Sequence, residues 1–61
     1  MIVATFTNED EQMQSNVLQI SSDAFRVILT DMESERTLPY MTTYDNLDKA
    51  VIKAKQIVNV D

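Results

Sequence analysis

The 61-residue chain contains no cysteine, histidine, glycine or tryptophan. Without cysteine there are no disulfides or thiol nucleophiles, and without cysteine and histidine the usual zinc ligands are missing. The lack of histidine also removes the most common general acid and base. Phosphate-binding loops need glycine where the backbone approaches the phosphate, so they are excluded as well. We therefore expect no cofactor, no metal site and no enzymatic activity.

Long hydrophobic runs are also missing. The apolar segment at residues 1–6 follows no basic stretch and is too short for a signal peptide. No run approaches the roughly 18 apolar residues that a membrane span requires. Because a chain without cysteine also suits a reducing compartment, we expect a cytoplasmic protein with no membrane contact.

The short length sets a limit on stability. Residues 1–61 can form only one small domain, which buries about 60% of the surface that the unfolded chain exposes. A core of this size rarely supplies more than roughly 3–5 kcal/mol of stability, and small domains usually add a disulfide cross-link or a structural metal. Since neither a disulfide nor a metal site is expected here, association with another chain, most simply as a homodimer, is the remaining way to gain stability.

β-Branched and aromatic residues predict strands over residues 1–7, 25–30 and 37–43, with a shorter apolar segment at 17–20. Residues 8–16 are polar and lack a period, so they are predicted as a loop. Ser21, Ser22 and Asp23 are turn formers, and residues 31–36 are a charged connection. Without glycine for tight hairpin turns, the connections should be longer loops. Pro39 lacks an amide hydrogen, which predicts that the last strand lies at an edge or enters the sheet late.

The segment after Tyr44 has the clearest pattern. Asp45 is the predicted N-cap, with Asp48 three residues later near the positive end of the helix dipole. Apolar residues then follow helical spacing and predict a helix over residues 46–58; they are Leu47, Ala50, Val51, Ala54, Ile57 and Val58. Strands followed by one amphipathic helix predict an α+β fold, a three- to four-stranded antiparallel β-meander packed against one C-terminal helix.

The sheet face away from this helix is expected to collect four apolar residues among threonine, glutamine and serine. Two interpretations stay open: a half-polar solvated face, on which single apolar residues are normal, or an oligomer interface with a second copy. The shortage of core slightly favours the interface. Its expected residues are Val3, Val17, Ile28 and Met41.

The charge is acidic and uneven. Ten acidic residues outnumber five basic ones, and residues 1–35 hold seven acids but only one base, Arg26. Two clusters form the expected partner-binding surface: Glu9, Asp10 and Glu11, and then Asp31, Glu33 and Glu35. If residues 31–35 were extended, their alternating carboxylates would repeat at about 6.7 Å and imitate a phosphate backbone.

Two other interpretations of these carboxylates are open. A charge run often serves only solubility, and three carboxylates can ligate a divalent cation. However, DMESER lacks the spacing and central glycine of an EF-hand loop. The excess of acid argues against direct binding of nucleic acid or anionic lipid.

These features together predict a small acidic, non-catalytic protein-binding module that contacts a protein partner with a basic surface. A phage-type inhibitor of a host nucleic-acid-binding protein is one form of this prediction, because the size, acidity and lack of catalytic residues resemble small proteins encoded by bacteriophages and mobile elements. That general likeness identifies no functional residue. The alternative is a structural or assembly module that homo-oligomerises through its sheet face or an edge strand.

Overall fold

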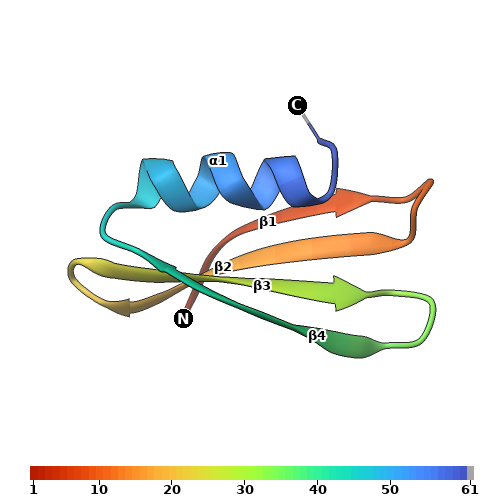
Figure 1. Ribbon diagram of the computed structural model, residues 1–61, viewed down its shortest axis with the longest axis horizontal. Helices are drawn as coiled ribbons and strands as arrows, with labels where there is room; N and C mark the ends of the chain where they lie inside the picture. The colour runs from red at the N-terminus through yellow and green to blue at the C-terminus, as the bar shows by residue number, and fades with distance from the viewer. Residues whose placement is uncertain (61) are drawn as a thin grey trace.

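The computed structural model describes residues 1–60, apart from the side chains of residues 39–41. Four strands are followed by one helix: β1 (Ile2–Asn8), β2 (Met13–Ser21), β3 (Ala24–Asp31), β4 (Arg36–Tyr44) and α1 (Leu47–Ile57). The strands pair antiparallel in the order β1-β2-β3-β4. The helix covers one face of this sheet (Figure 1). The predicted α+β meander with a C-terminal helix is therefore confirmed.

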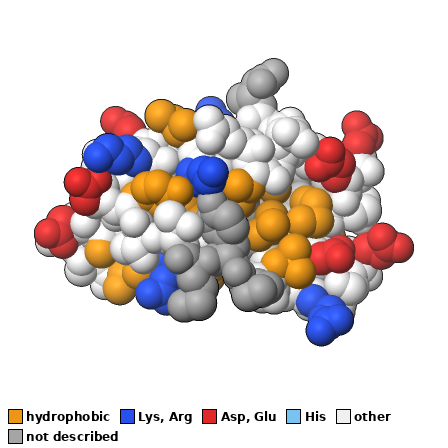
Figure 2. All heavy atoms as spheres, in the orientation of Figure 1, with side chains coloured by type: hydrophobic (Ala, Val, Ile, Leu, Met, Phe, Trp, Pro, Cys, Tyr) orange, Lys and Arg blue, Asp and Glu red, His pale blue; other side chains and the backbone are white. Residues whose placement is uncertain are grey.

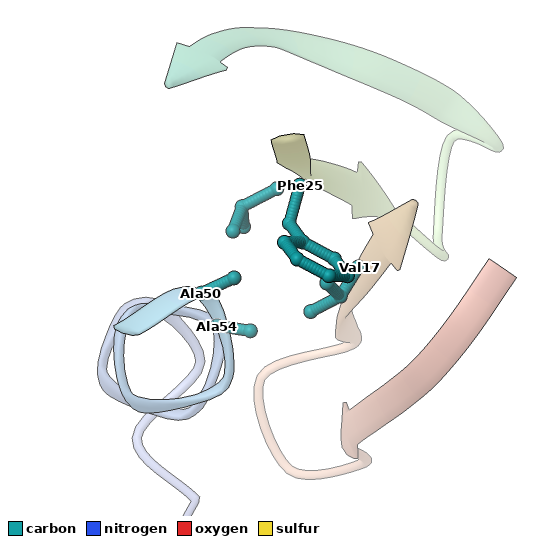
Figure 3. Packing of buried hydrophobic residues seen from close by; sticks show 5 residues of the cluster. Val17, Phe25, Ala50 and Ala54 are labelled. Carbon is teal, nitrogen blue, oxygen red and sulfur yellow. The ribbon is translucent and has the colours of Figure 1, made fainter. Parts of the chain in front are cut away.

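The core is small and lies between α1 and the two central strands. Val17 and Val27 pair across β2 and β3, and both are fully buried. The ring of Phe25 and the side chain of Val17 point toward Ala50 and Ala54 of α1 (Figure 3). Two alanines on the buried face allow α1 to approach the sheet closely.

Three turns connect the strands without glycine. Residues 9–12 and 32–35 form four-residue turns, whose last residues, Gln12 and Glu35, have left-handed φ angles of 55° and 57°. The middle turn has only residues 22 and 23, and the β2–β3 register shifts beside it, between Gln19 and Ser21. The prediction of longer connections is confirmed at the two outer turns and wrong at the middle one.

Strand β2 begins four residues earlier than the apolar segment that marked it. Residues 13–16, predicted as loop, pair with β1 on one side and with β3 on the other. Ser15 is fully buried, and its hydroxyl donates to the carbonyl oxygen of Ala54 at 2.7 Å. A polar residue thus occupies a core position in β2 and interrupts the alternation of apolar and polar residues that would indicate a strand.

The N-cap of α1 is Asn46 rather than the predicted Asp45. The Asn46 side chain accepts a hydrogen bond from the Lys49 amide at 2.8 Å. Asp45 instead pairs with the Lys49 ammonium group at 3.1 Å, one helical turn away. Both residue types cap helices well, and the one that lies where the backbone is still extended takes the position. Among the described residues, no helix is long and apolar enough to cross a membrane.

Candidate interaction surface

The two outer turns lie side by side at one end of the sheet. Both follow strands that run in the same direction, β1 and β3, and the Met32 amide donates to the Gln12 carbonyl at 2.8 Å. Figure 1 shows both turns at the same end of the long axis. The two acidic clusters, separated by about twenty positions in the sequence, are thereby brought together. We call this surface the acidic end; it consists of Glu9, Asp10, Glu11, Asp31, Glu33 and Glu35.

The first turn is ordered by its own polar groups. The Asn8 side-chain oxygen accepts from the Glu11 amide at 3.1 Å. The Gln12 side chain donates to the Glu9 carbonyl at 2.6 Å, and the Gln12 amide reaches the same oxygen at 3.3 Å. These bonds hold the backbone of residues 9–12, whereas the carboxylates of Glu9 and Asp10 project to solvent.

The C-terminal end of α1 is anchored to this turn. The Asn8 side chain donates to the Val58 carbonyl at 2.7 Å, and the Asn59 side chain donates to the Glu11 carboxylate at 3.2 Å. Asn59 has a left-handed φ of 55°, and the amides of Asn59 and Val60 donate back to Gln56 and Lys55, which is a Schellman ending. The negative end of the helix dipole therefore lies at the acidic end.

The second turn corrects one part of the prediction. Asp31 accepts hydrogen bonds from the amides of Glu33 and Ser34 at 3.0 and 3.4 Å, which is turn capping. Residues 31–35 are therefore not an extended row of carboxylates with a 6.7 Å repeat. Asp31 is half-buried and has a structural role, whereas Glu33 and Glu35 are exposed.

Few cations balance the acidic end. Arg36, opposite Asp31 in the β3–β4 register, is the base at its border. Among the described residues, the one ion pair within 4.0 Å joins Lys49 to Asp45 at the opposite end of the sheet. The Lys55 ammonium group lies over the Phe6 ring, 5.5 Å from its centroid. Figure 2 shows acidic side chains at both ends of the long axis, with a basic side chain near each end and further basic side chains between them.

In the part of the chain that is described, no three histidine, cysteine, aspartate or glutamate side chains converge as metal ligands would. An open, polar hollow of about 440 Å³ lies beside the first turn. Its lining consists of Thr7, Asn8, Glu9, Asp10, Asn59 and Val60. Carboxylates and amide oxygens at the rim of such a hollow can accept hydrogen bonds from an ammonium or guanidinium group.

The four residues expected at an oligomer interface do not share one surface. Val17 is 0% exposed in the core beneath α1, because its partner Val27 faces the helix. Val3 packs at the margin of the same core, since a register shift between Ile2 and Ala4 changes the alternation in β1. Ile28 is half-buried on the open face, and the side chain of Met41 lies outside the described residues.

The same register shift turns Ile2 away from the helix, opposite Leu18. Ile2 is 57% exposed and Ile20, further along β2, is 51% exposed. Of the expected residues whose side chains are described, only Ile28 lies on the open face, which also carries Ile2.

Two asparagines, Asn8 and Asn59, hold the helix to the first turn, and the sequence pattern does not indicate either contact. Each joins residues about fifty positions apart, whereas a local pattern reports only neighbouring positions. The only local sign is an asparagine after the last apolar residue of the helix, which is typical of a left-handed helix ending.

Comparison of the chain with protein-family models, with curated proteins and with solved structures gives no match.

Proposed function

We propose that this chain is a non-catalytic protein-binding module whose acidic end contacts a basic surface on another protein. The observation that carries the proposal is the Met32–Gln12 hydrogen bond, which holds the two acidic turns together. Hydrogen bonds already order the backbone of both turns, so binding has to order the carboxylate side chains but not the turns, which favours association. The helix C-terminus adds negative potential at the same end.

A nucleic-acid-binding protein is a partner class of matching charge, because its groove carries lysine and arginine that neutralise phosphates. A module that occupies such a groove excludes the nucleic acid and acts as an inhibitor. The absence of cysteine supports a cytoplasmic location for this activity.

The proposal can be tested with a defined basic probe, an octalysine peptide, titrated into the isotopically labelled chain at low salt. We expect amide shifts over residues 8–12 and 32–36, and little change over residues 22–24 and 45–48. Glu33→Lys with Glu35→Lys should weaken binding about tenfold, equivalent to about 1.4 kcal/mol. Neither carboxylate makes a hydrogen bond within the described part of the chain, so the fold should persist.

The matched control is Asp23→Lys with Asp48→Lys, which changes the net charge equally at the opposite end of the sheet. This variant should bind the peptide nearly as well as the parent chain. Equal weakening by both variants, or shifts spread over all acidic residues, would show that only net charge matters and would contradict the proposal. Binding should also decline as salt is raised toward 0.2 M.

A further inference from the structure

The two edges of the sheet differ in how well they are protected against pairing. At β4 the register with β3 shifts between Val27 and Leu29, and the strand contains Pro39, which lacks an amide hydrogen. Shifted register and proline are both devices that prevent an edge from pairing with another strand. At β1 the shift lies at the beginning of the strand, and residues 4–8 follow a regular register. These five residues include neither proline nor a charged side chain.

The helix also leaves β1 less covered than the central strands. The fully buried members of the core cluster come from β2, β3 and α1, whereas Val3, Ala4 and Phe6 are only partly buried at its margin. The Phe6 ring is covered on one side by the Lys55 ammonium group. An element placed beside β1 would remove further apolar surface from water in a chain whose core is very small.

The sequence of this edge matches an inverted copy of itself. Thr5 and Thr7 flank Phe6 symmetrically. In an antiparallel pair centred on Phe6, Phe6 lies opposite Phe6 of the second copy and Thr5 lies opposite Thr7. Aromatic pairs and threonine pairs are both favourable across antiparallel strands. No charged side chain lies among residues 4–8, which form the seam between the two copies in this pair.

The positions of the acidic turns favour the antiparallel arrangement over the parallel one. In an antiparallel pair centred on Phe6, the two Glu9 positions lie six residues apart along the seam, or about 20 Å. This separation exceeds the screening length of about 8–10 Å at moderate salt. A parallel pair would place the two acidic turns side by side. The geometry points to a homodimer in which β1 pairs antiparallel with β1 of a second copy, giving one continuous sheet, and we propose this assembly.

The mass in solution tests the assembly. At a concentration of about 0.1 mM, the parent chain should sediment as a particle of about twice its 7.0 kDa mass. Thr5→Lys with Thr7→Lys puts like charges opposite each other in the seam and should raise the dissociation constant at least tenfold. The matched control, Thr37→Lys with Thr43→Lys, changes two exposed threonines of β4 and should remain dimeric.

Introduced cysteines test the register, because the chain has none of its own. A mixture of the Thr5→Cys and Thr7→Cys chains should form disulfides between copies on oxidation, since directly opposed residues lie about 4.5–5.5 Å apart. Either chain alone should cross-link much less, because diagonal positions lie beyond about 7 Å. This test does not depend on the folding of the lysine variants.

A monomeric parent chain at 0.1 mM would overturn the proposal. A dimer that persists in Thr5→Lys with Thr7→Lys, or that is lost in the β4 control alone, would overturn it in favour of another interface. Equal cross-linking of the single-cysteine chains and their mixture would also overturn it. None of these outcomes bears on peptide binding at the acidic end, so the two proposals fail independently.

Discussion

At the scale of single residues, Ser15 has the most constrained polar side chain in the described part of the chain. It is fully buried in β2, and its hydroxyl bonds to a backbone carbonyl of α1 at 2.7 Å. A buried polar group is stabilising only when it has such a partner. The bond joins the sheet to the helix beside contacts that are made by small alanine side chains.

Replacing this serine tests that role. Ser15→Ala removes the hydroxyl and should lower the free energy of unfolding by about 1 kcal/mol. Urea unfolding at fixed protein concentration measures the effect. The control is Ser22→Ala in the exposed β2–β3 turn, which should change stability by less than about 0.5 kcal/mol. An unchanged or increased stability of Ser15→Ala would mean that the hydroxyl bond does not stabilise the packing of the helix.

At the scale of elements, the start of α1 depends on one side chain. Asn46 accepts from the Lys49 amide, and its backbone is extended at φ −147° and ψ 160°, as an N-cap requires. Asn46→Ala should therefore lower the free energy of unfolding by about 1 kcal/mol. Asp45→Ala removes only an exposed ion pair and should lower it by about 0.3–0.5 kcal/mol. Thermal unfolding followed by circular dichroism compares the two, and the reverse order would identify Asp45 as the cap.

The elements that the sequence predicts well are those whose pattern is set by burial on one face. In β3, Phe25 and Val27 alternate with Arg26, and in α1 the buried alanines recur every four residues. Strand β2 is harder because Ser15 occupies a core position and interrupts the apolar pattern. The first residues of β2 form a strand because they pair with β1 on one side and with β3 on the other. A local sequence pattern does not show such pairing.

The side of the sheet on which a residue lies is harder to predict than the strand itself, because one extra residue reverses the alternation of side chains along the strand. The register shift in β1 moves Ile2 to the open face and leaves Val3 at the core margin. The alternating pattern predicts Val17 on the open face, but its pairing with Val27 places it in the core. The sequence predicts the acidic clusters correctly as exposed charge, except for Asp31. Their meeting at one end follows from the meander order, whereas the shape of the second turn follows from capping by Asp31.

At the scale of the whole molecule, the acidic end opposes folding. Six of the ten acidic residues lie in or beside two adjacent turns, with Arg36 as the neighbouring base. Like charges about 8–10 Å apart in water repel by roughly 0.4–0.5 kcal/mol per pair before screening. Several such pairs are a considerable fraction of the stability available to a domain of this size. A surface kept for binding would show this cost, since charge used only for solubility need not be concentrated.

Salt should therefore stabilise the protein, and it should do so through this end. Raising sodium chloride from 20 to 200 mM at fixed protein concentration should raise the free energy of unfolding by about 0.5–1 kcal/mol, which corresponds to several degrees in Tm.

At 20 mM sodium chloride, Glu33→Lys with Glu35→Lys should be more stable than the parent chain and should gain less stability from added salt. Asp23→Lys with Asp48→Lys should be less stable, because it removes a carboxylate from the first turn of α1. If both variants responded to salt as the parent chain does, the repulsion would not be localised at the two turns. If Glu33→Lys with Glu35→Lys instead raises the stability and weakens peptide binding, as expected, the acidic end is maintained for binding at the expense of stability.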